Sequence, residues 1–455
     1  MFEKRSVIYW IQRLSPAKLL LLFYFLAIIF STTILMFPFV YKENEFVPFI
    51  DVLFTAVSTL TVTGLSTISI GDTFTTPGLI MLTIIMHLGA VGIMAVSTSI
   101  WLLLGKRIGL AERRLIMQDQ NQTSFGGMVS FIKQIVLAIV IVEIIGILIL
   151  GTYFLRYFND VSEAYFNGFF MTITALSNQG FSLDDHSLAM YHHDYFIQTI
   201  VMCLIIFGAI GFPVILELKH FIFKRKKSKL MFRFSLFTKV TTITFGILIS
   251  LGTIFIYLFD INGFFKDKGW HEGLFYALFQ SVTTRSAGLS TMDISLLSDT
   301  NHLFISFLMF IGASPSSAGG GIRTTTLALV IIFLITYAKG GERLKLFKRE
   351  IYDADLLKAV MVTIMAIVLV FISLLIITLI EPYSLEALLV EVTSAFGTVG
   401  LSLGITSELS IISKCLLMVL MFIGRVGVVT FLFSFRNNAR PEANIGYPKE
   451  RIIIG

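Results

Sequence analysis

The sequence predicts an all-α polytopic membrane protein built from four covalently linked repeats. Hydrophobic residues make up 56% of the 455 residues and charged residues only 14%, and the mean hydropathy is +0.85. Soluble domains are about 45–50% apolar and about 25% charged, so this chain carries more apolar surface than a soluble fold buries. The second observation is a phrase of glycine, a large apolar residue and serine, which occurs at 64–66, 180–182, 288–290 and 400–402.

The spacing of this phrase indicates an internal duplication. Its glycines follow one another at intervals of 116, 108 and 112 residues. A second signature, Gly-Ala in three copies and Gly-Arg in the last, follows each phrase after 24 to 28 residues, at 89–90, 208–209, 312–313 and 424–425. Two signatures at nearly fixed spacing predict four repeats. We place them at 18–108, 109–229, 230–350 and 351–436, between an N-terminal segment 1–17 and a tail 437–455.

Each repeat is expected to hold two spanning helices with a shorter re-entrant helix between them. About 20 residues cross the roughly 30 Å hydrocarbon core of a bilayer. Apolar stretches of about this length open the repeats at 19–36, 135–155, 240–259 and 359–380. The stretches that follow are too short to cross, at 54–61, 167–177, 273–284 and 385–396. A second long apolar stretch closes each repeat, so the sequence predicts eight spanning and four re-entrant helices around one central pore.

Basic residues predict the orientation of these helices. The segments between repeats carry 19 Lys and Arg residues, whereas the segments between the first and second spanning helices of all repeats carry 6. Basic loops stay in the cytoplasm, so both termini and the linkers between repeats are expected there. This bias accounts for the net charge of +6 without a nucleic-acid partner. The outer segments also hold 18 acidic residues, which would attract cations, although solvated loop charges give the same pattern.

The four phrases interrupt the helices at membrane depth. Irregular backbone is tolerated there only where protein buries it or where it lines a water-filled cavity. Four such segments around one axis would present a ring of carbonyl oxygens, which suits a dehydrated monovalent cation. An ordinary turn is the alternative for any single phrase. We predict a selectivity filter with its best cation site at the four glycines, formed by Thr61, Val62, Thr63, Gly64, Ser177, Asn178, Gln179, Gly180, Ser286, Ala287, Gly288, Thr398, Val399 and Gly400.

The last helix of the third repeat departs from the other three, which stay apolar. Proline removes a backbone donor, and each glycine costs about 1 kcal/mol in a helix, so this helix should break and form a gating loop at 312–326. A static kink is the alternative. Arg425 replaces the alanine of the other signatures, and it could hold the loop, act as an electrostatic barrier or pair with an acid. The predicted gate comprises Gly312, Ala313, Ser314, Pro315, Ser316, Ser317, Ala318, Gly319, Gly320, Gly321 and Arg425.

Arg285 stands three residues before the glycine of the third phrase. A guanidinium group inside a cation filter would repel the ion, so its side chain is expected to point behind the filter. Glu391, which lies in the fourth re-entrant segment, is the expected partner in a structural ion pair.

The phrases TVTGLS, SNQGFS, RSAGLS and GTVGLS, with the Gly-Ala or Gly-Arg signature, resemble the Trk/Ktr/HKT superfamily of cation transporters. The chain is most similar to the KtrB/KtrD-type membrane subunit of bacterial Ktr potassium-uptake systems. The resemblance implies four M1-P-M2 units like those of potassium channels, an intramembrane loop that obstructs the pore, and K⁺ at Gly64, Gly180, Gly288 and Gly400. Glycine in every filter goes with potassium preference in this superfamily.

The same resemblance implies partners and a location. These are a homodimer in the bacterial cell membrane and a cytosolic ring of RCK subunits, of the KtrA/KtrC type, that binds ATP, ADP or cyclic di-AMP. The chain itself has no dinucleotide fingerprint and no Walker motif, so nucleotides would act only through that ring, and no covalent cofactor is expected. The basic stretches 224–229 and 343–349 would dock the ring or set the topology, and the tail would lie near the dimer interface.

The expected function is therefore potassium uptake driven by the membrane potential. A coupled secondary transporter for sodium or another monovalent cation is the alternative, but its repeats would be inverted, whereas these run in one direction. An enzyme is not expected, because no paired intramembrane carboxylates, histidine cluster or nucleophile with a base stands out in the sequence.

Overall fold

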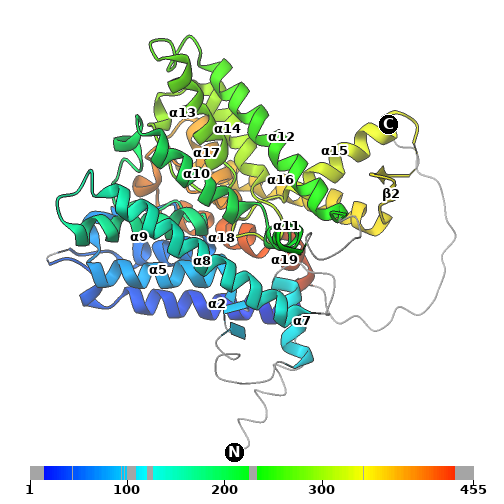
Figure 1. Cartoon of the computed structure of the whole chain (residues 1–455), viewed down its shortest axis with the longest axis horizontal. Helices are drawn as coiled ribbons and strands as arrows, with labels where there is room; N and C mark the ends of the chain where they lie inside the picture. The colour runs from blue at the N-terminus through cyan, green and yellow to red at the C-terminus, as the bar shows by residue number, and fades with distance from the viewer. Residues whose placement is uncertain are drawn as a thin grey trace, which may run out of the picture.

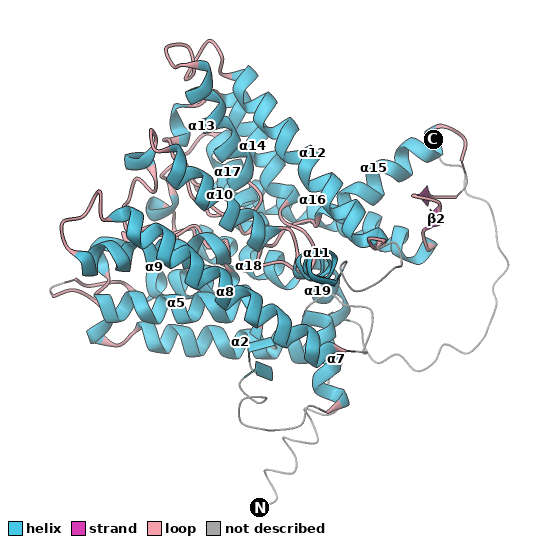
Figure 2. Cartoon of the chain, viewed as in Figure 1, coloured by secondary structure: helices cyan, strands magenta, loops and turns pink. Residues whose placement is uncertain are grey.

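The described part of the chain is almost entirely helical, as Figure 2 shows. The computed structural model describes residues 15–435 apart from 44, 94, 97, 100–108, 120–126, 225–232 and 342. Within these residues the strands form one antiparallel hairpin, β1 (Lys345–Leu346) with β2 (Arg349–Glu350). The predicted all-α class is confirmed. Most of the predicted N-terminal segment and the whole predicted tail lie outside the described residues.

Four long helices open the four repeats. They are α2 (Pro16–Leu35), α8 (Met128–Phe154), α12 (Leu236–Phe259) and α16 (Asp353–Ile380), and each is long and apolar enough to cross a membrane. Pro16 lies in the first turn of α2, and the hydroxyl of Ser15 accepts the N–H of Lys18 at 3.3 Å. Ser235 caps α12 in the same way. Large apolar side chains such as Phe371 are exposed on these helices, as lipid-facing surfaces require.

A short helix follows each long one: α3 (Phe49–Thr61), α9 (Val161–Ser177), α13 (Trp270–Thr283) and α17 (Leu385–Gly397). The first three begin several residues before the predicted starts, because the residue at the N-cap sets where a helix begins. Asp160, for example, caps α9 by accepting the N–H of Ser162 at 3.3 Å. The 13 residues of α3 cover about 20 Å, less than the hydrocarbon core.

The second helix of each repeat is bent or broken. α10 (Tyr195–Ala209) turns by 106° into α11 (Phe212–Lys224), and α18 (Ile411–Val426) turns by 99° into α19 (Val428–Phe435). A loop separates α14 (Asp299–Ile311) from α15 (Thr324–Ala338), and α5 (Thr76–Val91) ends at a glycine. By length and composition, the described residues hold four single spans and two bent pairs. The total of eight spans therefore stays a prediction.

The interruption expected only in the third repeat occurs in all of them, so that expectation was wrong. Gly92, Gly211 and Gly427 have φ angles of 93°, 99° and 94°, which glycine adopts without strain. Each stands three residues after the glycine of the second signature, where the third repeat has Pro315. A single glycine in an apolar run is compatible with a helix, so Gly92 and Gly427 alone do not predict a bend, whereas Pro213, two residues after Gly211, was a signal of one in the second repeat.

The four repeats close into a ring. Each second helix packs on the short helix of the next repeat: α5 on α9, α10 on α13, α14 on α17, and α18 on α3. The last contact joins the fourth repeat to the first, and Figure 1 shows the orange-red α18 close to the blue first repeat. At this contact Lys414 Nζ lies 2.9 Å from Asp51 Oδ1, and both side chains are mostly buried.

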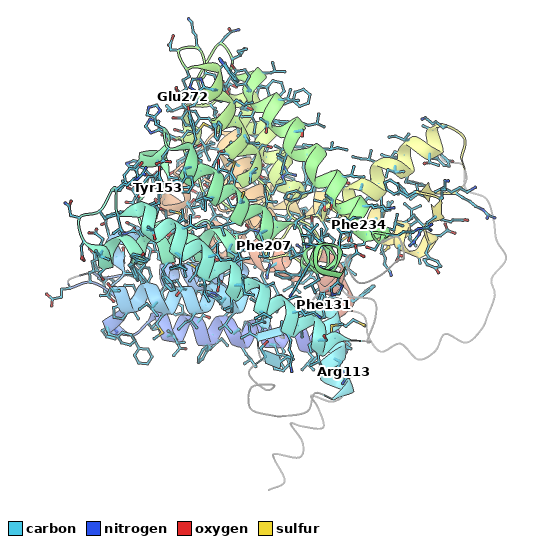
Figure 3. All side chains as sticks on the ribbon, viewed as in Figure 1. Arg113, Phe131, Tyr153, Phe207, Phe234 and Glu272 are labelled. Carbon is cyan, nitrogen blue, oxygen red and sulfur yellow. The ribbon has the colours of Figure 1, made fainter. Side chains whose placement is uncertain are left out.

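The remaining elements are small. They are α4 (Ile70–Thr73), α7 (Leu110–Asp119) and four 3-10 turns, Pro38–Val40, Ala189–Tyr191, Ile294–Leu296 and Thr406–Glu408. In Figure 1, α15 and the strand hairpin project from the other helices. Figure 3 shows Arg113 of α7 and Glu272 of α13 at opposite ends of the molecule, in the sense expected for a basic inner and an acidic outer side.

Candidate functional site

The four phrases meet at one place in the molecule. Their glycines have φ angles between 69° and 95°, where other residues are strained. A Cβ atom on any of them would lie 2.9 Å or less from a carbonyl oxygen of the next repeat, so only glycine fits. These approaches run from each repeat to the next around a circle. The distances from the added Cβ are 1.9 Å for Gly64 to Gln179 O, 2.9 Å for Gly180 to Ala287 O, 2.2 Å for Gly288 to Val399 O, and 2.4 Å for Gly400 to Thr63 O.

Hydrogen bonds explain how the phrases keep this shape. After α3, the N–H of Thr63 donates to the carbonyl of Ser58 at 2.9 Å, and the N–H of Gly64 donates to the Ser58 hydroxyl at 3.1 Å. Ser394 accepts the corresponding bonds after α17, at 2.9 Å and 3.0 Å. In both phrases the backbone N–H groups therefore donate to the serine near the end of the short helix. The carbonyl oxygens of the same phrase are left for another partner.

The ring carbonyls are buried and have no hydrogen-bond donor in the part of the chain that the structure describes. Among the described residues, none of the carbonyl oxygens of Thr63, Gln179, Ala287 and Val399 accepts a hydrogen bond. All four residues have an exposed fraction of 0%. A buried carbonyl without a partner is costly, so native structures supply it with a donor, water or an ion. Four such oxygens in a circle can replace the water shell of a monovalent cation.

The other predicted filter residues lie at the ends of the short helices. Thr61 and Ser177 are the last residues of α3 and α9, and their hydroxyls donate back to helix carbonyls at 2.7 Å and 2.6 Å. The third repeat differs, because Thr284 ends α13 in a right-handed conformation and Ser286 instead has φ 106°. The Ser286 hydroxyl donates to the carbonyl of Thr398 at 2.6 Å. Left-handed residues follow the other short helices: Val62, Asn178 and Thr398.

The predicted ion pair between Arg285 and Glu391 is absent. The carboxylate of Glu391 accepts hydrogen bonds from the hydroxyls of Ser402 and Thr406 in its own repeat, the latter at 3.0 Å. Arg285 is fully buried, and its Nη2 donates to the Thr284 hydroxyl at 3.5 Å. The expectation chose Glu391 by its position in the fourth re-entrant segment, whereas hydroxyls of Ser402 and Thr406 after α17 bond to the carboxylate.

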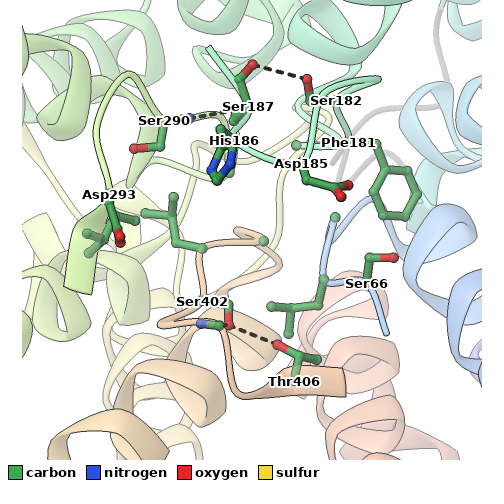
Figure 4. Close-up of a pocket in the computed structure, with 18 of the residues that line it drawn as sticks. Ser66, Phe181, Ser182, Asp185, His186, Ser187, Ser290, Asp293, Ser402 and Thr406 are labelled. Carbon is green, nitrogen blue, oxygen red and sulfur yellow. Dashed lines mark hydrogen bonds between the residues drawn. The ribbon is translucent and has the colours of Figure 1, made fainter. Parts of the chain in front are cut away.

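A cavity of about 450 Å³ opens on the predicted outer side of the ring, and we call it the vestibule. All four phrase glycines line it, together with Asp184, Asp185 and Asp293. Figure 4 shows Asp185, His186 and Asp293 around this space, with serine and threonine hydroxyls between them. Carboxylates around such a cavity attract cations to its mouth.

The loop between α14 and α15, residues 312–323, lies against the opposite side of the ring. A Cβ on Gly319 would meet the Ser286 hydroxyl at 2.4 Å, and one on Gly320 would meet the Thr398 hydroxyl at 2.5 Å. Ala318 packs against Val62 and Ala90. The predicted loop extended to residue 326, but α15 already begins at residue 324.

The bend of the second repeat holds this loop by its backbone. The N–H groups of Ser314 and Ala318 donate to the carbonyls of Ala209 and Gly208, each at 3.1 Å. The N–H of Phe212 donates to the carbonyl of Ser316 at 2.8 Å. Backbone groups of the loop that make no helical hydrogen bond thus pair with backbone groups of the second repeat. These bonds hold the loop on the side of the ring opposite the vestibule.

Arg425 connects the loop to the first repeat. Its exposed fraction is 7%, and its guanidinium group donates to backbone carbonyls. One guanidinium nitrogen donates to Ala318, and the other donates to Gly89 and, at 3.1 Å, to Ala90. Arg323, which the sequence analysis did not single out, donates to Gly319 in the same loop. Its position two residues after the last loop glycine was the available signal.

The second signature has a packing role. In three repeats, a Cβ on its glycine would collide with a carbonyl at the end of the short helix of the same repeat, whereas a Cβ on Gly312 of the third repeat would meet Gly320 O of the loop at 2.1 Å. Glycine therefore lets the second helix approach the short helix closely. The pairs are Gly89 with Leu60 O at 2.3 Å, Gly208 with Leu176 O at 2.1 Å, and Gly424 with Phe396 O at 2.0 Å.

A family model described as "Cation transport protein", TrkH, matches residues 19–445. The chain belongs to the TrkH family. This family transports cations and is not a family of enzymes, and the resemblance noted in the sequence is confirmed. Several apolar helices agree with a membrane transporter.

Relatives and a solved structure cover nearly the whole TrkH-family chain. Ktr system potassium uptake protein D of Bacillus subtilis (strain 168) is 53% identical over 445 residues, 98% of each chain. Ktr system potassium uptake protein B of the same organism is 34% identical over 455 residues, 100% of this chain and 99% of that one. The crystal structure of the potassium transporter TrkH from Vibrio parahaemolyticus matches with a TM-score of 0.71 and 18% identity, over 92% of this chain and 84% of that one. This likeness supports the fold.

Proposed function

We propose that this chain takes up potassium through the ring formed by its four phrases. The observation that carries the proposal is the circle of four buried carbonyl oxygens that accept no hydrogen bond from any described residue. Potassium is the ion because both Bacillus relatives are named potassium uptake proteins and because every phrase keeps its glycine. The ion sits at the level of Gly64, Gly180, Gly288 and Gly400, as the cargo of the protein.

Uptake begins in the vestibule, where Asp184, Asp185 and Asp293 raise the local concentration of cations. A potassium ion then exchanges its water for the ring carbonyls, which carry dipoles but no full charge, so the ion binds and also leaves. The membrane potential drives it inward with about 2.3 kcal/mol per charge for each 100 mV.

Residues 312–323 form the gate in this proposal, and we call them the gate loop. The loop contacts the inner side of the ring, so an ion that leaves the ring meets it next. Arg425 holds the gate loop against α5 by donating to carbonyls on both, and its charge opposes the passage of a cation. Pro315 and Gly319 to Gly321 prevent the loop from joining α14 and α15 into one helix.

A regulatory partner follows from the relatives, whose names place them in Ktr systems. We propose that two copies of this chain form a homodimer in the bacterial cell membrane, with all termini in the cytoplasm. A cytosolic RCK ring that binds ATP, ADP or cyclic di-AMP controls the gate. Arg343, Lys345 and Arg349 on the projecting hairpin are candidate contacts. Most of the other basic stretch and the tail lie outside the described residues.

The test is rubidium and sodium uptake in a bacterium that lacks its own potassium-uptake systems. Gly64→Ser places a side chain where a Cβ would lie 1.9 Å from Gln179 O, so we expect the preference for rubidium over sodium to fall. Gly246→Ser in α12 is the matched control, because its Cβ would meet no atom within 4 Å. Wild-type cells should grow at low potassium. Equal selectivity in both variants would contradict the filter, and sodium-dependent uptake by the wild type would favour the coupled sodium transporter.

A further inference from the structure

A small polar cavity of about 20 Å³ lies beside the gate loop, away from the ring. Four elements meet there: α2 brings Tyr24, α7 brings Asp119, the gate loop brings Ser316 and Arg323, and α18 brings Arg425. None of these residues except Arg425 and Ser316 was expected at a site. The cavity is large enough for about one water molecule, so the side chains around it are close neighbours.

The charges around this cavity are unequal. Arg323 and Arg425 are both permanently charged, and both donate hydrogen bonds to backbone carbonyls, which carry no full negative charge. In the described part of the chain, Asp119 is the only carboxylate that lines the cavity. A buried charge is costly unless an opposite charge lies near it, and two guanidinium groups on the ion path would also repel potassium.

Tyr24 fixes the position of Asp119. The Tyr24 side chain has an exposed fraction of 3%, and its hydroxyl donates to Asp119 Oδ1 at 3.2 Å. The Tyr24 ring also packs edge-on against Phe422 of α18, with 6.3 Å between ring centroids. Phe422 stands one turn before Arg425, so one tyrosine contacts both the acid and the helix that carries the arginine.

The acid comes from an unusual place. α7 belongs to the linker between the first and second repeats, on the predicted cytoplasmic side, and it packs on α2 and α8. Asp119 is its last residue, and the two bonded residues Tyr24 and Asp119 lie 95 positions apart in the sequence. The linker helix therefore reaches back under the gate loop with its end.

We propose that Asp119 is a positioning residue that supplies the counter-charge for the gate arginines. Its carboxylate, held by Tyr24, lowers the electrostatic barrier that Arg323 and Arg425 raise against a cation leaving the ring. The inference rests on the proposed gate. Because α7 carries the acid, any change in the position of this linker helix changes the barrier at the gate.

The experiment uses the full chain in membranes of potassium-uptake-deficient cells, with rubidium uptake corrected for the amount of protein. Asp119→Asn keeps an acceptor for the Tyr24 hydroxyl but removes the charge. We expect it to lower the maximal uptake rate about tenfold while KM for external rubidium stays unchanged, because the vestibule and ring are intact. Asp119→Glu restores the charge and should recover most of the rate. Equal losses in the Asn and Glu variants would overturn the proposal.

A double-mutant cycle separates charge from packing. In a chain with Arg323→Gln and Arg425→Gln, there is no excess positive charge to offset, so Asp119→Asn should have no further effect. A tenfold loss in that background would overturn the counter-charge role. A full rate in Asp119→Asn, with a raised rate in Arg425→Gln, would overturn the inference and leave the gate standing. If no change at the arginines or in the gate loop alters uptake, the proposed gate fails, and this inference fails with it.

Discussion

The second helices of the third and fourth repeats break at the same place in the repeat but in different ways. In the fourth repeat, Gly427 alone turns α18 into α19 by 99°. In the third, Pro315 stands at this position, and residues 312–323 separate α14 from α15. A bend at one residue leaves few backbone groups unpaired, whereas a loop leaves many that must find partners elsewhere.

Those partners explain why the two breaks have different roles. The loop of the third repeat takes its hydrogen bonds from the second repeat and from two arginines, and this network holds it against the ring. The bend of the fourth repeat is open at Gly427, where a Cβ would meet nothing within 4 Å, and the helix after it, α19, packs on α2 and α16. The break thus occurs at the same position in every repeat, and in the proposed gate its length determines which repeat closes the ion path.

Deletion of residues 314–321 is the change with the largest expected effect on this comparison. It would leave the third repeat with a short break like that of the fourth, and the obstruction below the ring would be gone. Rubidium uptake into potassium-uptake-deficient cells should rise by about tenfold or more. An unchanged rate at equal protein amount would show that the two breaks do not differ in function.

Arg425→Gln should have a smaller effect in the same direction. The variant loses the hydrogen bonds from the guanidinium group to the gate loop and to α5, and it loses one charge on the ion path. We expect rubidium uptake to rise about threefold to tenfold. Arg156→Gln is the control, because it removes the same charge on the predicted outer side, and its uptake should match the wild type. Equal rates in all three proteins would remove Arg425 from the gate.

Gly427→Ala should have the smallest effect, and it should act on stability rather than on flux. The added methyl group meets no neighbour, so the cost is the backbone strain of φ 94° with ψ 137°, about 1–3 kcal/mol. The Tm of the solubilised protein should fall by a few degrees with uptake per molecule unchanged. Gly424→Ala is the contrast, because its Cβ would lie 2.0 Å from the carbonyl oxygen of Phe396. This variant should lower both the Tm and the uptake per molecule.

Much of this arrangement could be predicted because it depends on local backbone geometry. Glycines that must approach a carbonyl leave a fixed pattern in the sequence, so the four phrases and the second signature were both visible. The bends at Gly92 and Gly427 could not be predicted in this way, because one glycine in an apolar run does not by itself distinguish a bend from a helix, whereas Pro213 beside Gly211 was a usable signal.

The contacts between distant side chains could not be predicted. Arg285 and Glu391 matched in charge, yet the acid bonds to hydroxyls nearby in its own repeat. Tyr24 and Asp119 carry no motif, and only the fold brings α7 to α2. Side-chain pairing of this kind depends on how the repeats are packed, and the sequence of a single repeat does not contain that information.

The ring closes where the last repeat meets the first, at the contact of α18 with α3 beside Lys414 and Asp51. No linker connects the two repeats there, because they stand at opposite ends of the chain. Because all four quarters lie on one polypeptide, they assemble at any dilution, and each quarter is free to diverge. Four identical subunits would have to fit four copies of the 312–323 segment into the space below one ring. One gate loop held by different neighbours on its two sides therefore requires repeats of unlike sequence, which a single fused chain provides and four identical subunits do not.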